Sequence, residues 1–408
     1  MSAVVQLAAN RPTLGALLDR IQPLTDIIAV GAAKRDLDRE LPFEAFRLFR
    51  DSGLGTLRIP VELGGPGGSI AHYIEMIAVL GGADSNVAHA LRSHFNFTET
   101  LLLAPDAPRA RRMIAQVLDG KLFAGAHTEQ GTKRPGEVTT KLTHQSDGTW
   151  RLNGRKWYAT GTAFADFASF SAMTDDGRGV SALLPVSRKG ITILDDWDGM
   201  GQKLTASGGV LLEDVEVFGD ELTERALDSR IGRHASAMRQ LHLAASAAGA
   251  VRAVLREGID YVRKQARAAA HSHAETARED HFVQTVIGEI AARSFAIDAL
   301  IGEGARKLDD TVAAFQTGDA ERIETALITS SLATARAQLI IADLALKAAE
   351  QMFELGGGSA TSRKYNFDRH WRNIRTVLNH NPLLHKARVV GDYLLNGTTT
   401  HLEEGKVF

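Results

Sequence analysis

The hydrophobic positions of this chain follow helical spacing in its first and last parts and strand spacing between them. From Thr13 to about Asp119, apolar residues recur every three or four positions and runs stop at glycine or proline, which predicts amphipathic helices. From Lys121 to about Asp220, short runs rich in Val, Thr, Trp and Phe alternate with Asp-Gly and Asn-Gly turns, which predicts β-strands. Long helical stripes return from about Ser236 onward.

This order of helix, strand and helix predicts an α+β fold of three domains. We expect an N-terminal helical domain over residues 1–120, a middle β-barrel or β-sandwich domain over 121–230 and a C-terminal helical bundle over 231–408. The layout does not identify a reaction, because one fold can host many activities.

Local signals place several elements within these domains. Ser69 can cap a helix that runs through Leu80, after a tight glycine-rich loop. Residues 191–193 and 210–217 have the composition of strands. A helix over 339–355 is expected to end at the glycines that follow it.

Composition narrows the possible chemistry. The 408 residues include no cysteine, which excludes disulfides, thiolate metal sites and thiol nucleophiles. His271 and His273 have no companion ligands at a recognised spacing, so no metal is expected. A formal net charge of −2 gives no general attraction to nucleic acid or anionic membrane. We therefore expect a small-molecule substrate. Because the N-terminus lacks the pattern of a secretory signal, we also expect a cytoplasmic protein.

Three motifs resemble, in their order and spacing, the acyl-CoA dehydrogenase fold family. They are the segment Ile59–Gly68, the segment Leu152–Gly161 and the tripeptide Met200-Gly201-Gln202. The resemblance covers nearly the whole chain and implies the three-domain fold of that family.

Dehydrogenase activity does not follow from this resemblance. Acyl-CoA dehydrogenases remove a proton with a carboxylate, usually a glutamate near the C-terminus. The corresponding stretch here, Arg372–Pro382, contains no carboxylate, and Asn381 stands at the position of the base. An amide cannot take up a proton at neutral pH.

The stretch from Tyr365 to Pro382 instead resembles dibenzothiophene monooxygenase-like flavoproteins of sulfur acquisition. The resemblance implies a two-component flavin-dependent monooxygenase. A separate NAD(P)H flavin reductase would supply reduced FMN, and oxygen would be transferred to a small organosulfur or nitrogen compound.

The resemblance also implies a flavin site made from several loops. In the family, the segment Trp157–Gly161 lies along the flavin ring, and Arg267 matches an arginine that binds the flavin phosphate. Ala268-Ala269-Ala270-His271 replaces the Phe-Gly pair that follows this arginine in FAD-binding relatives, which favours FMN over FAD. The implied cofactor contacts are Thr98, Ala126, Thr128, Glu129, Gln130, Gly131, Lys156, Trp157, Tyr158, Ala159, Thr160, Trp197, Arg267, Gly358, Ser359 and His380.

Simpler interpretations of these residues stay open. Residues 126–131 also fit a surface loop, Trp197 a packing residue and Arg267 a solvated helix charge. The glycines before Ser359 also fit a helix C-cap. In the family this turn meets a neighbouring subunit's flavin, which implies a homotetramer.

His94, His380 and Thr160 are the implied catalytic residues. A reduced flavin that activates oxygen needs nearby hydrogen-bond donors, and both histidines match the monooxygenase pattern. Thr98 stands where the relatives have a tyrosine, and Val377 where they often have another histidine. The resemblance therefore does not define the substrate.

Two other functions stay open. An FAD-dependent acyl-CoA dehydrogenase-like oxidoreductase would need a base from elsewhere, such as Glu354 or a carboxylate after Ser236. A non-catalytic flavin-binding member of the fold would retain flavin without substrate-dependent turnover.

Overall fold

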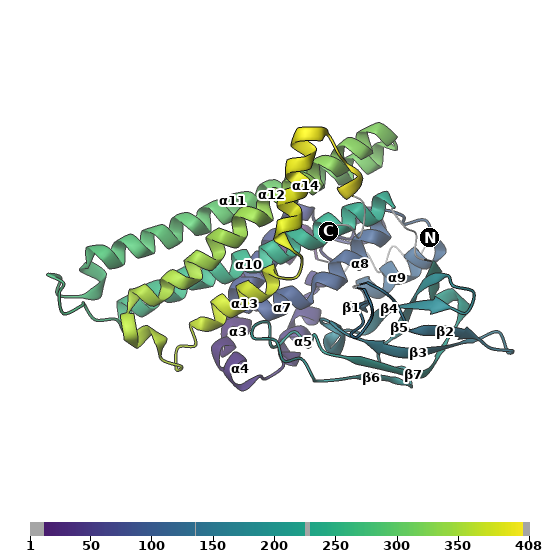
Figure 1. Ribbon diagram of the computed structural model, residues 1–408, viewed down its shortest axis with the longest axis horizontal. Coiled ribbons are helices and arrows are strands. Elements are labelled where there is room, and N and C mark those ends of the chain that lie inside the picture. Colours follow the sequence, from purple (N-terminus) through teal and green to yellow (C-terminus); the bar gives the residue numbers. More distant parts are fainter. Residues whose placement is uncertain (1–11, 135, 225–228, 403–408) are drawn as a thin grey trace.

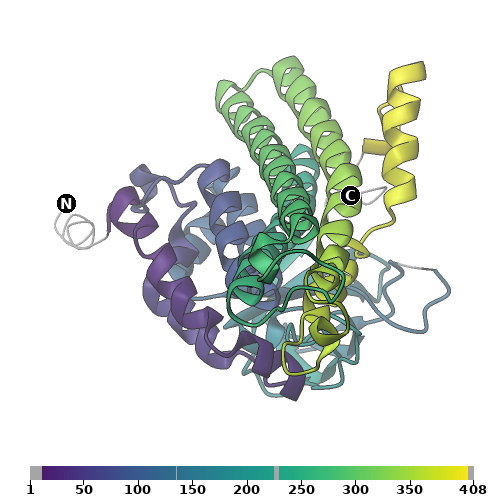
Figure 2. The same ribbon diagram turned by 90° about the vertical axis from the view of Figure 1, so that its left-hand side faces the viewer.

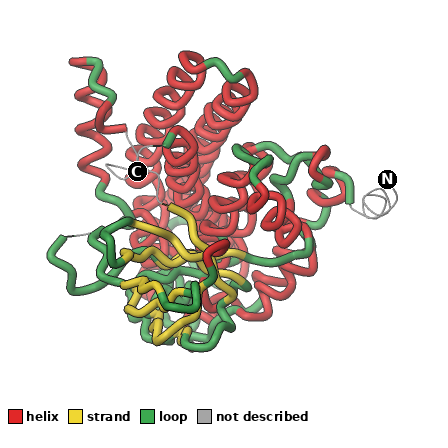
Figure 3. Tube along the Cα trace, turned by 90° about the vertical axis from the view of Figure 1, so that its right-hand side faces the viewer, coloured by secondary structure: helices red, strands yellow, loops and turns green. Residues whose placement is uncertain are grey.

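The computed structural model describes residues 12–134, 136–224 and 229–402, and the described chain has the order helix, sheet, helix that the sequence predicts. Figure 1 shows the sheet at one end of the molecule and the long C-terminal helices extending away from it. In Figure 3 the strands form one layer beside the helices.

The N-terminal region is built from short helices. Ser69 caps α6 as predicted, because its hydroxyl accepts a hydrogen bond from the backbone N–H of His72. The helices are α2 (Leu14–Leu18), α3 (Ile21–Ala29), α4 (Ala32–Asp38), α5 (Phe43–Ser52), α6 (Ile70–Ala83), α7 (Ser85–Ala90), α8 (Arg92–Leu102) and α9 (Pro108–Leu118).

The middle region is a single sheet of eight strands in the order β6-β7-β3-β2-β4-β5-β8, with β1 paired to β4. The strands predicted at 191–193 and 210–217 are β6 and β7, which pair in antiparallel fashion. The strands are β1 (Phe123–Ala126), β2 (Lys141–His144), β3 (Trp150–Lys156), β4 (Phe167–Thr174), β5 (Gly179–Pro185), β6 (Ile191–Ile193), β7 (Val210–Val217) and β8 (Leu222–Glu224).

The C-terminal region is a bundle of long helices that pack side by side (Figure 2). Its helices are α10 (Arg230–Lys264), α11 (His281–Thr317), α12 (Ala320–Gln351), α13 (Asp368–Leu378) and α14 (Leu383–Asn396). The segment Ala320–Leu355 is long and apolar enough to cross a membrane by composition, but more than half of its most apolar window is buried inside the protein. Its apolar face is therefore accounted for by packing in the bundle.

The backbones of α6 and α10 approach each other closely. A Cβ placed at Gly249 of α10 would lie 2.2 Å from the carbonyl oxygen of Ala78 on α6. Small residues surround this point on α10, from Ala244 to Ala250. This contact joins the N-terminal helices to the bundle and fixes α10 along the side of the cavity described next.

Candidate active site

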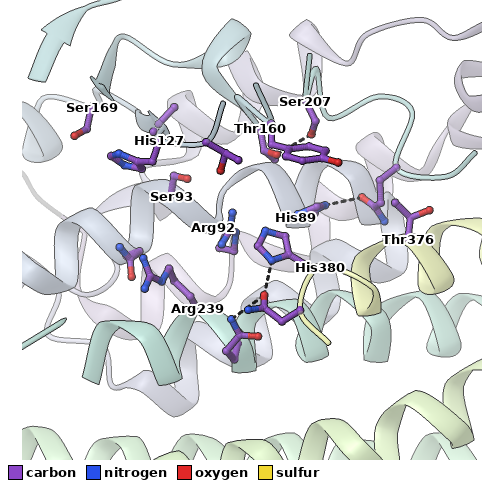
Figure 4. Close-up of a pocket in the computed structure, with 18 of the residues that line it drawn as sticks. His89, Arg92, Ser93, His127, Thr160, Ser169, Ser207, Arg239, Thr376 and His380 are labelled. Atoms are coloured by element: carbon purple, nitrogen blue, oxygen red, sulfur yellow. Dashed lines mark hydrogen bonds between the residues drawn. The ribbon is translucent and has the colours of Figure 1, made fainter. Parts of the chain in front are cut away.

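A cavity of about 820 Å³ lies where the three regions meet. Its lining comes from α7 and α8, from β1 and the loop after it, and from the loops that flank β3 and β7. The C-terminal region contributes α10 and the connection between α13 and α14. Figure 4 shows side chains from all three regions pointing into the same space.

Two loops of the middle region form one wall of the cavity. The N–H of Trp157 donates to the carbonyl of Thr128 at 2.8 Å, which holds the two loops side by side. Gly161 adopts a φ of 79°, and a Cβ there would lie 2.5 Å from the carbonyl oxygen of Ala90. As a result, Thr128, Tyr158 and Thr160 all line the cavity, as the resemblance implies.

The hydroxyl of Thr160 belongs to a chain of hydroxyls whose direction is fixed. Thr205 donates its proton to the carbonyl of Gln202 at 2.8 Å, so its oxygen must accept from Ser207 at 2.6 Å. Ser207 must then accept from Thr160 at 2.7 Å. In this arrangement the proton of Thr160 goes to Ser207, so Thr160 presents lone pairs to a ligand and not the donor that the sequence predicts.

The far wall of the cavity is made by α7 and α8, which are separated by a break at Leu91. The polar face of α8 points into the cavity and carries Arg92, Ser93, Asn96 and Thr100. The opposite face is buried in the core. Spacing of three and four residues therefore separates a ligand-facing side of α8 from a core-facing side.

His94 and Thr98 lie on the core-facing side of α8, so neither lines the cavity. The Nε2 atom of His94 donates to the carbonyl of Gly55 at 2.9 Å, and Nδ1 accepts from the N–H of Phe123. Burial lowers the pKa of His94 to about 4, which keeps the ring neutral. The structure does not place the predicted catalytic residue His94 in the cavity, and both of its ring nitrogens are engaged with the backbone.

His89 takes the place in the cavity that the sequence assigned to His94. Its Nδ1 donates to Oε1 of Gln202 at 3.2 Å, and its Nε2 has no hydrogen-bond partner among the described residues. Burial lowers the pKa of His89 to about 3. His89 therefore offers a neutral ring nitrogen with a lone pair. The ring centroids of His89 and His380 lie 6.3 Å apart.

The orientation of His380 is set by a network that begins at a buried lysine. The Nζ of Lys386 donates to Oε1 of Gln240 at 2.8 Å, which turns the amide N–H₂ of Gln240 toward Oδ1 of Asn381 at 3.2 Å. Oδ1 of Asn381 is thereby an acceptor, so Nδ1 of His380 must donate to it at 2.6 Å. The second ring nitrogen of His380 then carries a lone pair.

His380 lines the cavity, as predicted, and its side chain is exposed to that space. Burial by the surrounding protein, together with the charge of Arg92, lowers the pKa of His380 well below its usual value. The neutral ring is therefore a hydrogen-bond acceptor and a base. The predicted donor role is wrong because Asn381 takes the only N–H.

The predicted pair Glu129 and Lys156 is structural. The carboxylate of Glu129 accepts from Nζ of Lys156 at 2.6 Å and from backbone and side-chain donors of Thr139 and Thr140. Burial opposes ionisation of Glu129, but Lys156 and the two threonines outweigh it and lower the pKa to about 2. This network ties the loop after β1 to β2 and β3 and keeps both charges out of the cavity.

Other predicted residues also lie outside the cavity lining. Ala126, Trp157 and Ala159 are buried in the sheet or the loop that follows it, while Gln130 and Gly131 are exposed on the far side of their loop. Trp197 does line the cavity, and its ring lies 5.9 Å from that of Tyr158.

Arg267 follows the C-terminal end of α10, and Gly358 and Ser359 belong to a turn near that same end. The turn of Gly358 and Ser359 follows Gly356, whose Cβ position meets the ring of Tyr261 near the C-terminal end of α10. At about 1.5 Å per residue, the helix runs about 36 Å from Gln240 in the cavity to Lys264. In Figure 1 this end of the bundle and the sheet lie at opposite ends of the molecule. The cavity of the same chain cannot include these residues.

Sequence reasoning missed the cavity residues on α8 and α10. Ser93, Asn96 and Thr100 form a polar stripe at helical spacing, which was the available signal. Arg239 offered no local signal, because its place depends on how α10 packs against α8.

Comparison with known families agrees with this architecture. Residues 124–215 match the middle domain of acyl-CoA dehydrogenase, and residues 241–383 match its C-terminal domain. Together the two matches span more than half of the chain. The chain belongs to the acyl-CoA dehydrogenase fold family.

Within this family, the chain is similar to monooxygenases. It is 28% identical to the dibenzothiophene monooxygenase of Mycolicibacterium goodii, over 85% of this chain and 86% of that protein. It is 28% identical to the probable FMNH2-dependent monooxygenase SfnC of Pseudomonas putida, over 90% and 91% of the two chains. The crystal structure of FMN-bound TdsC from Paenibacillus sp. A11-2 superposes with a TM-score of 0.83, at 28% identity, over 94% of this chain and 98% of that one.

Proposed function

We propose that the protein is the oxygenase of a two-component flavin-dependent monooxygenase, which uses reduced FMN and O₂ to oxygenate a small organosulfur or nitrogen compound. One observation carries the proposal: none of the described residues that line the cavity is an aspartate or glutamate. A dehydrogenase of this family needs a carboxylate base at that place. His380 and Asn381 stand there instead.

The cavity suits FMN. Its volume of about 820 Å³ is large enough for a flavin ring and a small substrate. Buried polar atoms in its lining that lack partners among the described residues include Nε2 of His89 and Oδ1 of Asn96. Buried polar groups are normally satisfied, so these atoms indicate a polar ligand. Thr128 and Thr160 would meet the polar edge of the ring, with Tyr158 and Trp197 beside it.

The residues of the cavity would act by accepting protons and hydrogen bonds. Bound reduced FMN supplies the electrons with which oxygen is activated. Thr160 is placed to accept a hydrogen bond from an N–H of a ligand, because its own proton goes to Ser207. His380, with His89 nearby, is placed to accept a proton through a neutral ring nitrogen. Trp197 and Tyr158 restrict the access of water.

We further propose a homotetramer. Arg267 and the Gly358-Ser359 turn both lie near the C-terminal end of α10, about 36 Å along that helix from the cavity of their own chain. They could bind a flavin only in the cavity of a second copy. The exposure of all three residues supports this proposal.

The remaining proposals concern the cellular setting. We propose that a separate NAD(P)H flavin reductase supplies reduced FMN and that the reaction serves sulfur metabolism in the cytoplasm. We propose no nucleic-acid or membrane partner, in keeping with the net charge of −2.

Anaerobic titration calorimetry with reduced FMN and with reduced FAD tests the proposed cofactor. We expect FMN to bind at least tenfold more tightly, which corresponds to about 1.4 kcal/mol. Tighter binding of FAD, together with reduction of bound flavin by an acyl-CoA thioester, would instead support the dehydrogenase. Tight FMN binding without oxygenation of any substrate would indicate a non-catalytic flavin-binding protein.

A further inference from the structure

The cavity contains two arginines that the proposed flavin chemistry does not use. Arg92 opens α8 and Arg239 lies on α10, and both line the cavity. Figure 4 shows Arg92, Ser93 and Arg239 among the side chains that line the cavity, with Arg239 below Arg92. The two guanidinium groups therefore face the space that a substrate would share with the flavin.

No negative charge of the described chain balances Arg92. Its Nε atom has no hydrogen-bond partner among the residues that the structure describes, and none of those that line the cavity is a carboxylate. Burial, and then repulsion from Arg239, lower the pKa of Arg92 to about 10. The guanidinium of Arg92 is thus a half-buried cation beside a second cation.

Such an arrangement is unfavourable unless an anion joins it. Charges removed from water are strongly destabilised when they lack a partner of opposite sign. Other ion pairs of this protein show how arginines are normally satisfied: Arg58 holds Glu99 with both ends of the guanidinium at 3.0 Å. A planar guanidinium binds an oxyanion with two parallel hydrogen bonds.

The neighbours of Arg92 suit the rest of an organic anion. Ser93 offers a hydroxyl, and Arg239 donates to Oγ of Ser236 at 2.8 Å, which holds its side chain in place. Phe97 and Met200 supply apolar surface in the same cavity. A small molecule with one charged end and an apolar body matches this lining.

We propose that Arg92 and Arg239 bind the anionic group of the substrate, so that the enzyme oxygenates a small organic oxyanion, such as a sulfinate, and not a neutral heterocycle. This inference rests on the proposed monooxygenase function. For a sulfinate, one oxygen atom of O₂ would form a new bond to sulfur and give a sulfonate. The other would leave as water, with two electrons from reduced FMN and two protons.

Binding measured on the protein loaded with oxidised FMN tests this directly and needs no turnover. The probes are benzenesulfinate and methyl phenyl sulfone, which have nearly the same shape but differ in charge. We expect benzenesulfinate to bind at least tenfold more tightly. Arg92→Gln and Arg239→Gln should each remove most of this preference and leave the binding of the sulfone unchanged.

Arg306→Gln is the matched control, because Arg306 is an exposed arginine on α11, outside the cavity. It should leave the binding of both probes unchanged. An unchanged affinity for FMN and riboflavin shows that a variant is folded. Because riboflavin lacks the phosphate of FMN, comparing the two affinities shows whether the arginines contact that phosphate. Unchanged affinity for both flavins is expected in Arg92→Gln.

Two results would overturn the inference. Equal affinity of the wild-type protein for the two probes would mean that charge is not recognised. A tenfold loss of FMN affinity in Arg92→Gln, with riboflavin binding unchanged, would assign the arginines to the flavin phosphate. Neither result contradicts the monooxygenase function, which fails only if no compound is oxygenated in the presence of FMN and a reductase.

Discussion

The protonation pattern of His380 depends on Lys386, a residue that lies outside the cavity. Lys386 is fully buried, and burial lowers its pKa to about 7. It donates to the side-chain oxygens of both Gln240 and Gln338, and Gln338 is itself held by the backbone carbonyl of Gln240. Through Gln240 and Asn381, this lysine determines which nitrogen of His380 carries the proton.

Lys386→Met should therefore impair the reaction without removing any cavity residue. The amide of Gln240 would be free to turn, and the loss of one orienting hydrogen bond, about 1.4 kcal/mol, would lower kcat by about tenfold. FMN affinity should not change. Lys347→Met, at an exposed lysine on α12, is the control. Equal kcat values for the two variants would show that the network does not orient His380.

The pH dependence of the rate provides a second readout of the same group. The pKa of His380 is depressed, so the neutral, proton-accepting ring is present at neutral pH and is lost only when the pH falls below the ordinary histidine range. We expect kcat/KM to stay level from about pH 8 to about pH 6.5 and to fall in more acidic solution. In His380→Gln this acidic decline should disappear. A decline that persists in His380→Gln would belong to another group.

At the scale of elements, the contact between α6 and α10 supports one side of the cavity. Gly249→Ala would place a Cβ 2.2 Å from the carbonyl oxygen of Ala78 and 2.5 Å from the N of Gly82. The helices would have to separate, at a cost of about 1–3 kcal/mol. Gly288→Ala is the matched control, because it lies exposed on α11 with nothing within 4 Å of the new Cβ.

Urea denaturation followed by circular dichroism compares the two glycine variants. Gly249→Ala should lower the midpoint of unfolding, whereas Gly288→Ala should leave it unchanged or raise it, because alanine favours a helix over glycine by about 1 kcal/mol. Similar midpoints for the two variants would mean that α6 and α10 are not held at this close distance.

Features that depend on local sequence could be predicted, and those that depend on packing could not. The Ser69 cap and the existence of strands β6 and β7 follow from nearby residues. The position of His94 depended on which face of α8 meets the core. The roles of Glu129 and Lys156 depended on a contact between the loop after β1 and the end of β3. The donor and acceptor roles of Thr160 and His380 could not be predicted, because each role depends on all the hydrogen bonds of the network that contains the residue.

At the scale of the whole molecule, the cavity and the residues implied in phosphate binding lie in different places. If Arg267 completes the site of a second copy, Arg267→Gln should weaken FMN binding by about tenfold while riboflavin binding stays unchanged. Sedimentation equilibrium should show a tetramer with no stable monomer. A monomer that binds FMN with full affinity would contradict this arrangement.

The central claim is that the cavity transfers an oxygen atom from O₂ to a substrate. The measurement that tests it most directly is mass spectrometry of products formed under oxygen-18 gas, from a panel of sulfur and nitrogen compounds, with FMN, NADH and a flavin reductase. Catalase is present so that free peroxide cannot act. We expect one oxygen-18 atom in the product, and none when the reductase is omitted. A product whose new oxygen comes from water, or an unlabelled desaturated product from an acyl-CoA thioester, would contradict the claim.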